Sequence, residues 1–152
     1  MITKKNIEHI KEKTNECAAK AAEMLTWIET GDGDGNGLAD ELWSIIGFDR
    51  DGHYVHDSLL WSLNRPIDDS IIGYENGIWL IYNDCVGDDR NDPLPKWVKE
   101  GMRENYTDML SAVYGVEKSE IDADVDVIIA GNRMLSYATD VACDARNHGV
   151  ER

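Results

Sequence analysis

The spacing of apolar residues over positions 3–29 predicts a long amphipathic helix. Successive members of its apolar stripe are three or four residues apart: Ile7, Ile10, Thr14, Cys17, Ala21, Met24 and Ile28. Thr3 is placed to cap the start of this helix. Gly31 and the polar run that follows it are placed to end the helix.

Two further helices are predicted near the other end of the chain, over residues 95–114 and 119–147. The apolar face of the first includes Tyr106 and Leu110. Gly115 and Gly149 follow the two helices and are typical of helix termination, and Ser119 is expected to cap the start of the second.

The middle of the chain, residues 38–86, contains apolar β-branched runs interrupted by Asp-Gly at 51–52 and Asn-Gly at 76–77. Such dipeptides between apolar runs favour tight hairpins. We therefore predict an α+β fold, in which a small antiparallel sheet of two hairpins is covered by the three helices. The alternative is an all-α fold with short helices over 38–64 and 68–84, since the first of these segments begins with good helix formers.

The charge of the chain is strongly one-sided, with 30 acidic residues against 15 basic ones and a net charge of −15. Acidic residues alternate with apolar ones, and 42% of the residues are hydrophobic, which is typical of a folded protein. We expect a single acidic globular domain over residues 1–152. Its charge would repel nucleic acid and anionic membranes and would attract cations and basic proteins.

The cysteines and the apolar runs bear on location. Cys17, Cys85 and Cys143 are scattered and odd in number, which is typical of free thiols in an intracellular protein. The N-terminus lacks the apolar core of a signal peptide, and the longest apolar run, at 78–82, is far too short for a membrane span. These features predict a soluble, cytoplasmic protein.

A short Asp/Gly run resembles part of a calcium loop. Asp32, Asp34 and Asn36 fall at positions 1, 3 and 5 of an EF-hand loop, Gly37 falls at position 6, and Asp40 falls at position 9. Position 12, which should be a bidentate Glu, is Trp43. Calcium binding by Asp32, Asp34, Asn36 and Asp40 is therefore one hypothesis, and a flexible turn after a long helix is the other.

The histidines raise the alternative of a metal-dependent enzyme. His53 and His56, with Asp57 beside them, have the spacing of a metal site only if the segment is helical. On a strand the two histidines would point to opposite faces. No nucleophile elbow, phosphate loop or dinucleotide fingerprint accompanies them.

Repeated acidic pairs are the remaining candidate. On the last predicted helix Asp122 and Asp126, and likewise Asp140 and Asp144, are i,i+4 neighbours whose repulsion costs about 0.2–0.5 kcal/mol per pair. A basic partner would relieve that repulsion. We therefore predict a non-catalytic inhibitor or binding protein that engages a basic protein, as nucleic-acid mimics of phage or plasmid anti-defence systems and toxin-immunity proteins do. The residues expected to bind that partner are Asp88, Asp89, Asp92, Asp122, Asp126, Asp140 and Asp144.

Overall fold

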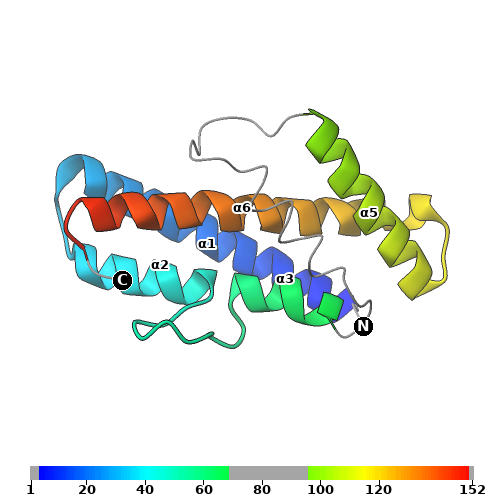
Figure 1. The fold of residues 1–152 in the computed structure, drawn as a ribbon, viewed down its shortest axis with the longest axis horizontal. Helices are drawn as coiled ribbons and strands as arrows, with labels where there is room; N and C mark the ends of the chain where they lie inside the picture. Colours follow the sequence, from blue (N-terminus) through cyan, green and yellow to red (C-terminus); the bar gives the residue numbers. More distant parts are fainter. Residues whose placement is uncertain (1–3, 69–95, 151–152) are drawn as a thin grey trace.

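A computed structural model describes residues 4–68 and 96–150, and these residues form a bundle of helices (Figure 1). In chain order the elements are α1 (Lys4–Thr30), α2 (Gly35–Ile46), α3 (Leu59–Asp68), α5 (Lys96–Tyr114), the short 3₁₀ helix η1 (Lys118–Ile121) and α6 (Asp122–Asn147).

The first and last helices form the centre of the bundle. α1 and α6 pack along each other and run in the same direction, and α2 and α3 lie end to end against both of them in the opposite direction (Figure 1). α5 crosses near the beginning of α6. Among the described elements α5 packs mainly on α6 and η1.

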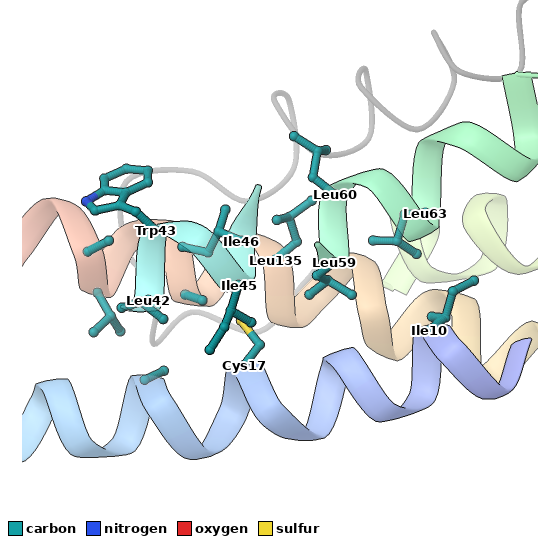
Figure 2. Packing of buried hydrophobic residues seen from close by; sticks show 14 of the residues in the cluster. Ile10, Cys17, Leu42, Trp43, Ile45, Ile46, Leu59, Leu60, Leu63 and Leu135 are labelled. Atoms are coloured by element: carbon teal, nitrogen blue, oxygen red, sulfur yellow. The ribbon is translucent and has the colours of Figure 1, made fainter. Parts of the chain in front are cut away.

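The apolar stripe predicted for α1 is confirmed as part of the core. Ile7, Ile10, Cys17, Ala21 and Met24 are all buried. Figure 2 shows Cys17 below Ile45 of α2 and Ile10 facing Leu63 of α3, with Leu59 and Leu135 between the helices. Burial of an isoleucine, leucine or methionine side chain adds about 1.5–3 kcal/mol to the free energy of unfolding, relative to the same side chain exposed. The core therefore depends on contacts between the two ends of the chain.

A glycine allows α1, α3 and α6 to approach one another closely. A Cβ atom at Gly131 of α6 would lie 3.1 Å from Leu63 Cδ2, 3.2 Å from Ile10 Cγ2 and 3.2 Å from Thr14 Oγ1. A side chain at this position would push α6 away from α1 and α3 together.

α5 is attached to α6 by a mixed apolar and polar contact. Tyr106 and Leu110 are fully buried, as predicted for the apolar face of this helix. The side-chain amide of the buried Asn132 donates a hydrogen bond to the Tyr106 hydroxyl. This bond fixes the position of α5 along α6, because a buried amide that lost it would be costly.

The predicted sheet is wrong, and the all-α alternative fits the described residues, which contain no strand. The apolar run at 44–48, which precedes the Asp-Gly turn and was expected to be a strand, forms none. Residues 44–46 belong to the last turns of α2, where Leu42, Trp43, Ile45 and Ile46 are buried with helical spacing. Gly47 ends the helix, and its N–H donates to the Trp43 carbonyl at 2.9 Å.

The Asp-Gly turn nevertheless forms. The N–H of Gly52 donates to the Asp49 carbonyl at 3.0 Å, and that of Asp49 donates to the His53 carbonyl at 2.9 Å. Pairing of the flanking segments stops at one antiparallel bridge, between Phe48 and Tyr54. The second predicted hairpin, at 76–77, lies outside the described residues.

The helix ends agree with the glycine pattern but not with the predicted cap. Gly31, Gly115 and Gly149 follow α1, α5 and α6 with φ values of 71°, 67° and 99°, a conformation that glycine adopts without strain. Ser119 does not cap α6. It lies within η1, and α6 begins after Ile121 without a side-chain cap.

Candidate functional site

Two of the predicted partner-binding carboxylates already have a partner within the protein. The Arg103 guanidinium of α5 donates to Asp126 and, at 3.1 Å, to Asp122. The hydrogen bond to Asp126 is the main cause of a raised pKa for Arg103. Because both aspartate side chains are more than half exposed, these ion pairs contribute at most about 1 kcal/mol each. The repulsion between Asp122 and Asp126 is relieved without an external partner.

The other predicted pair lies at the opposite end of α6 and is less accessible. Asp140 and Asp144 are only partly exposed. The main-chain oxygen of Asp144 accepts hydrogen bonds from the backbone N–H of His148 at 3.2 Å and lies 2.9 Å from His148 Nδ1. Asp88, Asp89 and Asp92 lie outside the described residues.

The Asp/Gly run between α1 and α2 has a structural role that the calcium hypothesis did not include. Asp34 is the N-cap of α2, and its Oδ1 accepts a hydrogen bond from the N–H of Gly37 at 3.0 Å. Asp40 lies on α2, and its Oδ1 accepts a hydrogen bond from Arg50 Nε at 3.2 Å. Asn36 is also on α2, while Asp32 is exposed in the turn. Calcium would have to compete with these contacts for Asp34 and Asp40.

The structure draws attention to an acidic region that the i,i+4 pattern missed. Residues 21–49 contain seven carboxylates and no lysine, arginine or histidine. Three of these carboxylates, which we name the acidic end, are exposed where α1 ends and α2 begins: Glu29, Asp32 and Asp34. The C-terminal part of α6, which carries Asp140 and Asp144, lies at this same end of the bundle (Figure 1). The uninterrupted run of acid in the sequence was the signal that could have identified this region.

The two cations that border this stretch both fold back onto α2. Lys20 lies 2.6 Å from Glu23 and 2.5 Å from Glu41, so it links α1 to α2. The hydrogen bond to Glu23 is the main cause of the raised pKa of Lys20, followed by that to Glu41. Arg50 pairs with Asp40, beside Glu41. These contacts pair the carboxylates in the middle of α2, whereas Glu29 and Asp32 of the acidic end form no ion pair with a described residue.

The histidines take separate partners. The ring of His56 packs at a tilt of 58° against Trp61, with centroids 4.4 Å apart, and Asp57 Oδ1 lies 3.8 Å from His9 Nε2. His53 instead lies with Asp49 and Asp51, and one ligand atom from each of the three falls within 4.8 Å of the others. The predicted His53–His56–Asp57 combination is therefore not assembled. The group that does assemble was not predicted.

One carboxylate among the residues that the structure describes is buried, and its role is structural. Asp124 pairs with Lys4, which joins the N-terminal ends of α6 and α1. Burial, together with the nearby charge of Asp124, raises the pKa of Tyr114 to about 12. The Lys4 ammonium also lies 5.2 Å from the centre of the Tyr114 ring, a cation–π distance. These three residues hold α1, α5 and α6 together.

No helix within the described residues combines the length and the apolar character needed to span a bilayer. Comparison with known proteins finds no protein-family model, no curated protein and no solved structure that matches this chain.

Proposed function

We propose that this chain is a non-catalytic acidic protein that binds a basic protein partner, either as a nucleic-acid mimic or as an immunity protein for a basic toxin. The observation that carries the proposal is the acidic end, where Glu29, Asp32 and Asp34 are exposed in a stretch of 29 residues that contains no basic residue. A net charge of −15 would accelerate the approach of such a partner from any direction. A cytoplasmic location belongs to the same proposal, since free thiols persist in a reducing compartment.

The acidic end is a better binding surface than the start of α6. Asp122 and Asp126 share Arg103, so a basic partner would have to displace an existing ion pair there. Glu29 and Asp32 form no ion pair with a described residue, and a partner would meet no such competition. Asp34 can accept a further hydrogen bond through its second oxygen while it caps α2.

Association is the step that should reveal this surface. Exposed charges at an interface act mainly on the rate of association and on its salt dependence, and less on the lifetime of the complex. Screening at 0.15 M salt shortens their range to about 8 Å. We therefore expect fast binding at low salt that slows steeply as salt is added.

The test begins with affinity capture from lysate at low salt, salt-gradient elution and identification by mass spectrometry. The association rate of the captured partner is then measured by surface plasmon resonance at several salt concentrations. The variant that tests the surface neutralises the acidic end without removing the helix cap: Glu29→Gln, Asp32→Asn and Asp34→Asn. Asparagine is as good a cap as aspartate, so this variant keeps its fold.

A matched control removes the same amount of charge from exposed positions elsewhere: Glu8→Gln, Glu12→Gln and Glu120→Gln. We expect the variant of the acidic end to slow association about tenfold at low salt and to flatten its salt dependence, and the control to do much less. Equal effects of the two variants would show that only net charge matters and would reject this surface. A captured partner that is not basic, or whose binding does not depend on salt, would refute the function.

A further inference from the structure

The connection between α2 and α3 contains a tight turn that is fixed to the core. Its base is the bridge between Phe48 and Tyr54, and the N–H of Val55 donates to the Gly47 carbonyl at 3.0 Å. The ring of Phe48 packs edge-on against Trp43 of α2, with centroids 6.5 Å apart. Side chains at the tip of the turn are exposed, but the backbone that carries them has a defined shape.

Three potential metal ligands gather on this turn. Asp49, Asp51 and His53 each place a ligand atom within 4.8 Å of the other two. The distance from His53 Nδ1 to Asp49 Oδ2 is 3.6 Å. Zinc–ligand bonds of about 2.0–2.1 Å at tetrahedral angles place neighbouring ligand atoms about 3.3 Å apart. Small side-chain rotations would therefore bring this pair into coordination distance.

The backbone orients the Asp49 carboxylate for this role. Its Oδ1 accepts hydrogen bonds from the N–H of His53 at 2.8 Å and of Asp51 at 3.0 Å. These bonds, with that from His53 as the largest cause, hold the pKa of Asp49 below its usual value. The other oxygen, Oδ2, is the one that faces His53. Hydrogen bonds that fix a ligating carboxylate in this way are typical of supported metal sites.

The neighbouring cation points elsewhere. Arg50 lies between Asp49 and Asp51 in the sequence, and its guanidinium pairs with Asp40 of α2. The turn therefore offers two carboxylates and an imidazole together, whose formal charge of −2 with a neutral imidazole would be balanced by a divalent ion.

We propose that Asp49, Asp51 and His53 form a binding site for a divalent transition metal ion, with Zn²⁺ as the probe. An imidazole ligand suits zinc and its neighbours in the transition series, whereas calcium and magnesium take oxygen ligands. Three protein ligands leave at least one coordination position for water or for a group of a partner molecule. The site is separate from the acidic end, and the proposal does not depend on the proposed function.

The test is calorimetric titration of the full chain with zinc chloride at pH 7.5. Thiols also bind zinc, so the reference protein carries Cys85→Ser and Cys143→Ser. In this background we expect one equivalent of zinc to bind, and His53→Ala to lower the affinity at least tenfold. The matched control is His56→Ala, which removes the other imidazole of the same segment and is expected to leave the affinity unchanged.

Each alternative result overturns the proposal. Absence of zinc binding to the reference protein would reject the site, as would equal affinity in the His53→Ala variant. Calcium binding that survives His53→Ala, without zinc binding, would reject the transition-metal assignment. Far-ultraviolet circular dichroism checks that each variant is folded, which we expect because the side chains of His53, His56 and Cys143 are exposed.

Discussion

Replacement of Gly131 by alanine is the most direct test of how closely the central helices pack. The added Cβ atom would approach three atoms to within 3.1–3.2 Å, from Leu63 of α3 and from Ile10 and Thr14 of α1. Carbon atoms pack best at about 3.5–4.0 Å, so the contacts with Leu63 Cδ2 and Ile10 Cγ2 are a few tenths of an ångström too short. Leu63 and Ile10 are almost completely buried and have little room to move.

Two opposing effects set the change in the free energy of unfolding caused by Gly131→Ala. Overpacking of a core by an extra carbon typically costs about 1–3 kcal/mol. Replacement of a glycine by alanine inside a helix returns about 1 kcal/mol through helix propensity. The free energy of unfolding of the Gly131→Ala protein should therefore fall by about 0–2 kcal/mol.

Gly101 supplies a control that isolates the packing contribution. It also lies inside a helix, α5, and a Cβ atom there would meet no atom within 4 Å. Gly101→Ala should therefore raise the stability by up to about 1 kcal/mol. Urea unfolding followed by circular dichroism measures both variants, and the difference between them should be about 1–3 kcal/mol at an unchanged slope. Equal stabilisation by the two alanines would refute the close approach of α6 to α1 and α3.

Three further predictions concern a cap, two thiols and a phenol. Asp34→Ala removes the N-cap of α2 and should lower the stability of the protein by about 1 kcal/mol, which lowers the thermal midpoint. The control Asp32→Ala should leave the thermal midpoint nearly unchanged. Equal losses of stability in the two variants would argue against the cap. Iodoacetamide should label the exposed Cys143 in the native protein but not Cys17, whose pKa burial raises to about 12; rapid labelling of both, located by peptide mass spectrometry, would contradict the buried position. Tyr114 should ionise near pH 12, well above the ordinary pKa of a tyrosine. Its raised pKa contributes stability that is complete below about pH 10 and is lost as the pH rises towards 12, so the alkaline unfolding profile of Tyr114→Phe should lack that loss.

The helices at the two ends of the chain could be predicted because the apolar spacing and the terminal glycine of each one can be read within its own sequence. The α1 stripe from Ile7 to Met24 has helical spacing, and Gly31, Gly115 and Gly149 mark ends that the structure confirms. The middle could not be predicted from the same local signals. An apolar run that ends in glycine is typical of a strand before a hairpin and also of a helix before its terminal glycine, and only the burial of Leu42 and Ile46 together decides between them.

For the acidic groups, too, one part could be predicted from the sequence and another part depends on the fold. The excess of carboxylate over residues 21–49 can be read from the sequence, but which of these groups remain exposed depends on where Lys20 and Arg50 fold back. The pairing of Asp122 and Asp126 with Arg103 depends on how α5 docks on α6, which no pattern within either helix specifies.

The group on the turn between α2 and α3 also escaped prediction. The sequence predicts the turn that carries Asp49, Asp51 and His53, but the alternation of faces along a strand, which was applied to His53 and His56, is no guide to neighbours within a turn. The tight turn brings the three side chains together around the Asp49 carboxylate instead.

The pairing of α1 with α6 has a consequence for synthesis on the ribosome. Lys4 and its partner Asp124 are 120 residues apart, and the helix that covers α1 most extensively, α6, is made after all the other described helices. α1 therefore leaves the ribosome with its apolar stripe only partly covered by α2 and α3, and the core closes only when α6 has emerged. Contacts this distant in sequence slow folding relative to helical proteins built from neighbouring segments. During that interval the nascent chain exposes surface that chaperones recognise, and its dense negative charge keeps neighbouring chains apart.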